Sequence, residues 1–233
     1  MIVVIPTIFE SPYLTGMLDV IEDDSDVFNV VLVNNSTGPK KSLREDMPLH
    51  TAMARLKANG RILVLNTNGM SIYSAWNIGI QMGDAEDEFV AVLNDDLVLQ
   101  PGSLAAAKAA FDFPCPESKE WGLIGLNYFE PNRQVDATAP VREVIGTYRT
   151  RGFGGFAFVL PPDSPFADEE YRWWYGDDDL GERIKATGRK LGLAYGAPVD
   201  HPAPGTSSAK FPRPPEDYQH DLDRFRRIWP DAP

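Results

Sequence analysis

The chain has 233 residues, enough for one large α/β domain or two small ones, and 43% of them are hydrophobic, which permits a sizeable core. The formal net charge of −12 disfavours general nucleic-acid binding, which normally requires a basic surface. Cys115 is the only cysteine, which excludes an intrachain disulfide.

The first residues are apolar but do not form a targeting signal. They lack a basic segment, and Pro6 interrupts the run. No stretch approaches the roughly 20 apolar residues of a membrane helix. We therefore expect a cytoplasmic protein without a membrane anchor.

Apolar runs alternate with helical periodicity along the first half of the chain. There we expect strands at 2–5, 29–33, 61–65 and 89–93, and helices at 14–22, 51–58 and 72–82. Further on we expect helices at 104–111, 177–187 and 215–228, and strands at 122–126, 153–160 and 190–195, with a loop from residue 197 onward. The strand at 153–160 is expected to be interrupted at Gly154 and Gly155. This alternation predicts a layered α/β domain with a mostly parallel sheet.

The run Phe89–Leu93 reads as a buried strand, and Asn94, Asp95 and Asp96 follow it directly. Ligands of open α/β sheets bind just beyond the carboxyl ends of strands. Neighbouring carboxylates at such an edge suit Mg²⁺ or Mn²⁺ carrying a phosphate-bearing ligand. An Asp-rich turn at the end of a strand is the structural alternative.

Two later segments also carry polar groups that suit chemistry. Trp173, Trp174 and Tyr175 precede three consecutive aspartates, Asp177–Asp179. Acidic residues favour a helix N-terminus for structural reasons alone. Aromatic faces beside carboxylates also suit a sugar or nucleoside, and one carboxylate could act as a general base. His201 lies in a Gly/Pro-rich stretch, where it is either structural or completes a metal sphere.

These three segments, in this order, resemble a GT-A glycosyltransferase of the family 2 type. The resemblance covers roughly residues 1–207, with 208–233 as a Pro-rich tail that carries a surface helix. It implies an α/β, Rossmann-like three-layer sandwich with a mostly parallel central sheet.

The resemblance implies roles for the acidic motifs. The "LNDDL" segment is similar to a variant of the family's Asp-x-Asp motif, which makes Asp96 the main metal ligand with Asn94 and Asp95 in support. His201 falls where the family has a His that contacts metal or phosphate. The "GDDDLGERIKATGRKLG" stretch resembles "EDxDLxxRxxxxG", which puts Asp177 at the base position and Asp178 as the alternative. Gly176 replaces the usual Glu.

Other matching segments imply the donor side of the site. Asn34 stands where the family often has an Asp that contacts the base or ribose, so nucleotide preference stays open. Gly155 lies in a Gly-rich strand whose backbone approaches the substrates. The implied donor-contacting residues, taken together, are Thr7, Glu10, Asn34, Asn35, Asn77, Asn94, Asp95 and Gly155.

The implied activity is a metal-dependent, inverting transfer from a nucleoside-diphosphate sugar to an acceptor hydroxyl, with Mn²⁺ or Mg²⁺ as cofactor. The acceptor is left open among a glycan, a small molecule, a protein and a modified DNA base. The alternatives are a nucleotidyltransferase and an inactive sugar-nucleotide-binding module. Four basic residues are candidates to bind phosphates or an acidic acceptor: Arg149, Arg151, Lys210 and Arg213. The alternative for each is a solvated surface charge.

Overall fold

The computed structural model describes residues 1–9, 11–35, 48–67, 69–128, 140–147, 152–202 and 214–232. Predictions made for Glu10, Arg149, Arg151, Lys210 and Arg213 lie outside these ranges and stay predictions.

The N-terminal half forms four parallel strands in the order β3-β2-β1-β4. Their bounds are β1 Ile2–Thr7, β2 Asn29–Asn34, β3 Ile62–Asn66 and β4 Val90–Leu93. The connecting helices are α1 Leu14–Asp23, α2 Pro48–Ala58 and α3 Ile72–Glu86. Every one of these elements was predicted, although α2 begins earlier and α3 ends later than expected.

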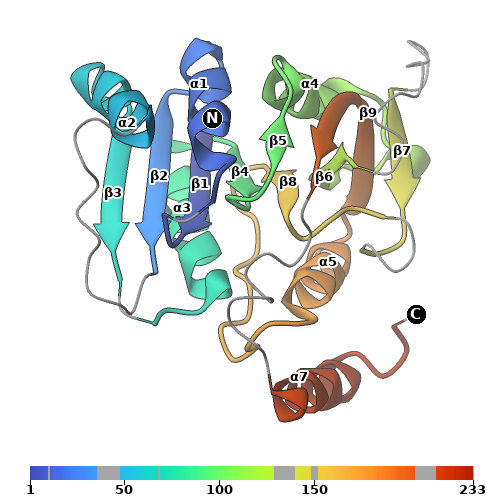
Figure 1. Ribbon diagram of the computed structural model, residues 1–233. Coiled ribbons are helices and arrows are strands. Elements are labelled where there is room, and N and C mark those ends of the chain that lie inside the picture. Colours follow the sequence, from blue (N-terminus) through green and yellow to red (C-terminus); the bar gives the residue numbers. More distant parts are fainter. Residues whose placement is uncertain are drawn as a thin grey trace.

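The C-terminal half extends the same sheet (Figure 1). Its strands are β5 Val98–Leu99, β6 Trp121–Asn127, β7 Val141–Val144, β8 Ala157–Leu160 and β9 Lys190–Asp200. Its helices are α4 Ser103–Ala109, α5 Gly176–Ala186 and α7 Pro215–Ile228, with short 3-10 turns at Ala110–Asp112 and Pro116–Ser118.

The sheet is mostly parallel, as predicted. Among the described strands, β1, β2, β3, β4, β6 and β9 run in one direction. The strand β8 lies between β4 and β6 and is antiparallel to both, while β5 and β7 run antiparallel to β9.

Two predicted strand boundaries were wrong. The strand expected over 153–160 begins only at Ala157, because the chain turns before it and the Ala157 amide donates to the Gly154 carbonyl at 3.1 Å. The last strand does not end at Tyr195 with a loop from residue 197, since β9 continues to Asp200. Pro198 is tolerated there because it sits at a shift in the register with β6. The short strands β5 and β7 were not predicted.

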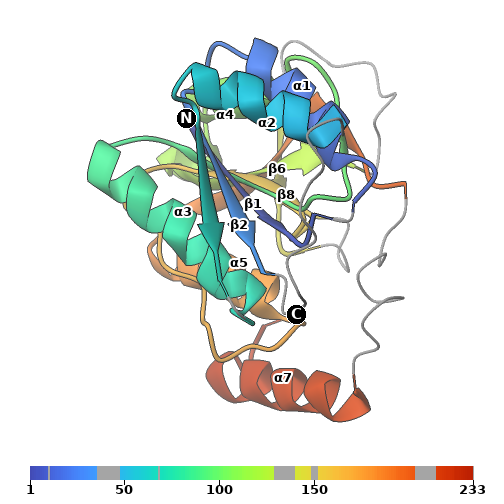
Figure 2. The same cartoon turned by 60° about the vertical axis from the view of Figure 1, so that its left-hand side comes forward.

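Helices cover both faces of the sheet and make three layers (Figure 2). One core packs α1, α2 and α4 against the face that carries Val3 and Ile5 of β1. The other packs α3 and α5 against the face that carries Ile2 and Val4. The strand β1 therefore buries its side chains on both faces, which explains its continuous apolar sequence. No helix in the described ranges is long and apolar enough to span a membrane.

The helix α7 docks below α5 (Figure 1) and is more than the surface helix that was predicted. Its Phe225 and Asp221 are buried, at 7% and 0% exposure. Arg224 of α7 pairs with Asp168 at 2.5 Å, and Arg183 of α5 pairs with the same carboxylate at 3.2 Å. Asp168 therefore ties α5 and α7 to the segment that precedes α5.

Close packing of α3 on β1 gives a stability prediction. A Cβ added at Gly79 would lie 2.6 Å from Cγ1 of Val4, closer than side chains tolerate. We expect Gly79→Ala to lower the free energy of unfolding by about 1–3 kcal/mol because the core is overpacked. The control is Gly16→Ala on α1, where no atom lies within 4 Å and a helical alanine should gain up to about 1 kcal/mol. The measurement is urea unfolding. An equal change in the free energy of unfolding of the two variants would contradict this packing.

The ion pairs of Asp168 give a prediction with a defined pH dependence. Burial raises the pKa of this carboxyl, but the hydrogen bond and the charge of Arg224 outweigh it and hold the pKa below its ordinary value. A lowered pKa contributes stability above the unfolded-state value near 4, and this contribution is lost as the pH falls through the folded-state pKa. We expect Asp168→Asn to lower the free energy of unfolding by about 1–3 kcal/mol at pH 7. The difference from the wild type should shrink in unfolding experiments below about pH 4; a constant difference would argue against the ion pair.

Candidate active site

Polar residues end four neighbouring strands at one edge of the sheet. Thr7 is in register with Asn34, and Asn34 with Asn66. Asn94 follows β4, which pairs in parallel with β1. The carboxyl ends of these strands therefore place Thr7, Asn34 and the Asn94–Asp96 segment at a common edge, where α/β proteins bind ligands.

Asp95 links the end of β4 to the end of β1. Thr7 Oγ1 donates to Asp95 Oδ2 at 2.7 Å, and Ser11 Oγ donates to the Asp95 carbonyl at 2.5 Å. Burial raises the pKa of the Asp95 carboxyl to about 6; the hydrogen bond from Thr7 opposes this rise and the charge of Asp96 adds to it. Negative charge is therefore disfavoured at this position.

Asp96 and His201 form a buried pair between the ends of β4 and β9. His201 Nε2 lies 3.1 Å from Asp96 Oδ2, and each side chain is 9% exposed. The His201 ring packs on Phe156 with centroids 4.5 Å apart, and on Tyr128 at 6.1 Å. The two predicted metal ligands, about a hundred residues apart in the chain, thus lie side by side.

The turn before β8 connects this pair to the N-terminus of α5. The Asn94 amide donates to the Phe156 carbonyl at 2.8 Å. One residue earlier, a Cβ on Gly155 would lie 2.6 Å from Cβ and Cγ of Asp177. Glycine at 155 therefore lets Asp177 approach the backbone beside Phe156, whose ring touches His201. The predicted metal pair and the predicted base share this turn as a common neighbour.

The three consecutive aspartates of α5 have different surroundings. Asp178 accepts a hydrogen bond from the hydroxyl of Thr147. Asp179 is fully buried, and it accepts from Arg183 at 2.5 Å and from Trp229 Nε1 of the chain following α7 at 2.8 Å. Asp179 therefore has a structural function, whereas Asp177 lies against the turn that adjoins the Asp96–His201 pair.

Amides gather at the ends of β2 and β3. Asn34 Nδ2 donates to Asn66 Oδ1 at 2.9 Å, and the Asn35 amide donates to the Thr7 carbonyl at 2.9 Å. The side chain of Asn35 donates to the Met70 carbonyl. These contacts hold the predicted donor-contacting residues Asn34 and Asn35 beside Thr7.

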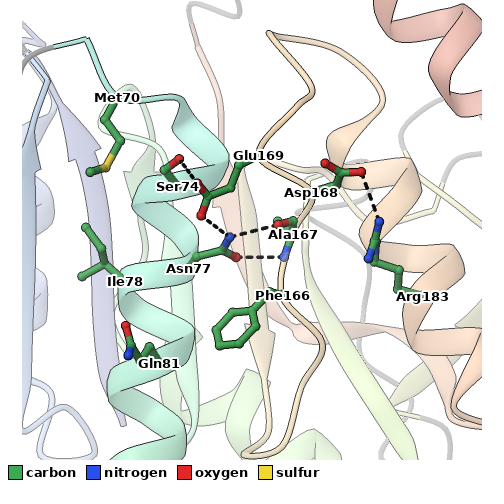
Figure 3. Close-up of a pocket in the computed structure, with 10 residues that line it drawn as sticks. All are labelled: Met70, Ser74, Asn77, Ile78, Gln81, Phe166, Ala167, Asp168, Glu169 and Arg183. Atoms are coloured by element: carbon green, nitrogen blue, oxygen red, sulfur yellow. Dashed lines mark hydrogen bonds and ion pairs between the residues drawn. The ribbon is translucent and has the colours of Figure 1, made fainter.

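Asn77 makes a different set of contacts, with Ala167 and Glu169. Its Nδ2 donates to the Ala167 carbonyl at 2.9 Å and to Glu169 at 2.8 Å, and its Oδ1 accepts from the Ala167 amide at 2.8 Å (Figure 3). An open groove of about 730 Å³ runs here between α3 and residues 166–169. Ser74 and Asn77 donate to Glu169, and Asp168 pairs with Arg183, so most of the polar side chains that line the groove are engaged with one another. We therefore place the candidate site at the carboxylates and not in this groove. Asn77 holds a loop in this structure, and its predicted donor contact is untested.

The segment that leads into α5 is fastened to α7, which the sequence analysis missed. Asp221 accepts hydrogen bonds from the backbone amides of residues 172–174. The next residue, Tyr175, has φ 62° and ψ −3°, a left-handed conformation that costs a non-glycine residue roughly 1–2 kcal/mol. It stacks on Phe225 at 5.3 Å, and its hydroxyl lies 2.9 Å from that of Tyr218. The sequence signal was present: Tyr218, Asp221, Leu222 and Phe225 share one helical face.

Comparison with known proteins agrees with this geometry. Residues 2–117 match the description "Glycosyl transferase family 2". That range contains β1 to β4 and the acidic segment Asn94–Asp96, but ends before His201 and Asp177. A search of curated protein sequences found no significant match.

Solved structures resemble the chain over nearly its whole length. S. aureus TarS 1-349 is 14% identical with a TM-score of 0.64, and the alignment covers 99% of this chain and 65% of that one. The same protein in complex with UDP-GlcNAc is 15% identical with a TM-score of 0.67, and the alignment covers 99% of this chain and 66% of that one. GalNAc-T7 with UDP, GalNAc and Mn²⁺ is 12% identical with a TM-score of 0.61, and the alignment covers 86% of this chain and 43% of that one.

At these identities the structural likeness shows the fold alone. The chain spans just under two thirds of TarS 1-349 and 40% of the longer TarS chain. The chain therefore has the GT-A fold, and residues 2–117 match glycosyl transferase family 2, which confirms the expectation of a GT-A, family 2-like fold.

Proposed function

We propose that this protein transfers a sugar from a nucleoside-diphosphate sugar to an acceptor hydroxyl, with inversion at the anomeric carbon. One observation carries the proposal: Asp177 lies against Gly155, while His201, paired with Asp96, packs on the adjacent Phe156. A glycosyl transfer needs a group for the departing diphosphate and a base for the incoming hydroxyl within reach of one carbon atom.

Residues at the sheet edge suit a divalent cation, Mn²⁺ or Mg²⁺. Asp96 Oδ2 and His201 Nε2 are an oxygen and a nitrogen donor 3.1 Å apart. Asn94 Oδ1 is buried and accepts no hydrogen bond from the described residues. No group of three or more His, Cys, Asp or Glu in the described ranges would enclose a metal. Such cations are commonly held by one or two carboxylates with substrate phosphates and water completing the sphere. When bound, the cation would neutralise charge on the leaving diphosphate.

Polar groups at the ends of β1 and β2 are proposed to hold the donor nucleotide. Thr7, Asn34 and Asn35 lie together there, and hydroxyl and amide groups suit the edges of a base and the hydroxyls of a ribose. Structures with this fold have been solved with UDP-GlcNAc and with UDP. UDP-sugars are therefore the first donors to test.

Asp177 is proposed to take the proton from the acceptor hydroxyl. It stands in the first turn of α5 and against Gly155, so its position is set by a helix and by a turn. Trp173, four residues earlier in the sequence, is 39% exposed, and its ring is proposed to stack on an acceptor ring. This supports a sugar-bearing acceptor over the other hydroxyl compounds considered.

Donor binding should depend on a divalent cation and on Asp96. Nucleotide sugars screened with and without Mn²⁺ or Mg²⁺ should raise the melting temperature for one donor only when the cation is present. At 100 times the dissociation constant, binding stabilises by about 2.7 kcal/mol. The shift should vanish in Asp96→Ala and persist in the control Asp23→Asn, an exposed carboxylate at the far end of α1. A complete panel without a cation-dependent shift would contradict the proposal, and pyrophosphate release from a nucleoside triphosphate and a sugar phosphate would indicate a nucleotidyltransferase.

Loss of the base should separate chemistry from binding. We expect Asp177→Asn to bind the donor as the wild type does but to transfer sugar about 10²–10⁴ times more slowly, the usual range for general-base assistance. Asp178→Asn, whose wild-type carboxylate is held by Thr147, should lose much less. The measurement is single-turnover transfer under saturating donor. Equal loss in the two variants would refute the assignment of Asp177, and a wild type that binds the donor without any transfer would indicate a binding module.

A further inference from the structure

Asp221 is a carboxylate that neither the acidic motifs nor the proposed chemistry accounts for. It lies on α7, far from the motifs in sequence, and is 0% exposed. A buried carboxylate is unfavourable unless hydrogen bonds compensate it. Most of its hydrogen bonds come from one short stretch of backbone, which makes this contact different from the ion pairs that dock the rest of α7.

Three consecutive backbone amides converge on Asp221. The amide of Arg172 lies 3.0 Å from Oδ1, and those of Trp173 and Trp174 each lie 2.9 Å from Oδ2. His220 Nδ1 lies 2.9 Å from Oδ1. Successive N–H groups that point to one place form a concavity that binds an anion. The carboxylate therefore selects the conformation of residues 172–174.

This conformation is passed on to the start of α5. Tyr175 follows in the left-handed region and is held by Phe225 and Tyr218 of α7. Gly176 then packs against the Tyr73 ring, where a side chain would collide, and its amide donates to the Tyr73 hydroxyl at 3.3 Å. Asp177 comes next. Every residue between the Asp221 contacts and Asp177 is therefore fixed by a named partner.

We propose that Asp221 is a positioning residue for the acceptor side of the site: by binding the backbone of residues 172–174 it presents Trp173 to the acceptor and sets the direction of Asp177. This inference rests on the proposed function. It assigns α7 to acceptor binding and leaves the donor edge, formed by β1, β2 and β4, independent of it.

Asp221→Asn keeps the shape of the side chain and removes its charge. Because three amides donate to it, an amide group at this place either opposes an N–H with another donor or accepts more weakly. We expect kcat/KM for the acceptor to fall by about 10- to 100-fold, as for a small misplacement of reacting groups. Donor affinity, measured by cation-dependent thermal shift, should stay within about two-fold of the wild type.

Two variants on α7 serve as controls. Arg224→Gln removes the ion pairs with Asp168 and Glu170 and so loosens the same helix without touching residues 172–174. Asp223→Asn removes an exposed carboxylate that accepts from Gln219 on the same helix. Assays are run at a temperature well below every melting point, so that unfolded protein does not enter the comparison.

Hydrogen exchange gives a readout that needs no turnover. Amides of Trp173 and Trp174 should exchange about ten times faster or more in Asp221→Asn and at the wild-type rate in both controls. Unchanged exchange in Asp221→Asn overturns the positioning role, whether or not the protein transfers sugar. Acceptor kcat/KM that falls no further than in Arg224→Gln, or donor affinity that falls with it, also overturns the role. A wild type that binds no nucleotide sugar instead overturns the proposed function, and exchange alone then tests the ordering of the loop.

Discussion

The antiparallel pairing of β8 with β4 and β6 is the constraint on which the candidate site depends. It joins the all-parallel N-terminal strands to the C-terminal half of the sheet. It also brings the turn before β8 to the carboxyl end of β4, where the Phe156 carbonyl receives the Asn94 amide. Gly155 and Phe156 can then contact Asp177 and His201. Without this reversed strand, the carboxylates of β4 and α5 would lack a common neighbour.

Much of the fold could be predicted because local patterns decide it. The strand β1 is apolar on both faces, and α1 buries Leu14, Met17, Leu18 and Ile21 at helical spacing. The errors fall where distant contacts override local signals. Glycines shorten β8, and β9 continues through Pro198 because its partners β5 and β6 hold it on either side of a register shift. The strand β7, with two exposed polar residues in the middle, exists only by pairing with β9.

The candidate site also has parts that the sequence predicts and parts that it does not. Asp96, His201, Asp177, Thr7 and Asn34 could be named from motif order, and the structure brings them to one edge of the sheet. The meeting of α7 with residues 172–175 was missed for a different reason: the buried face of α7 leaves a helical pattern in the sequence, but its partners are backbone amides nearly fifty residues away, and these leave no trace. Asn77 shows the opposite case: a motif position whose amide is engaged by the loop at Ala167 and Glu169.

The buried and partly buried aspartates of this molecule differ in how far their surroundings compensate the negative charge, and this difference distinguishes structural from chemical roles. Arg183 and Trp229 compensate Asp179, backbone amides compensate Asp221, and Arg224 holds the pKa of Asp168 low. Asp95 is different, since burial and the charge of Asp96 raise its pKa to about 6 against the opposing hydrogen bond from Thr7. A raised pKa means that the surroundings do not fully compensate the ionised form. Under the proposed function, a divalent cation arriving with its diphosphate would supply this compensation at the strand end.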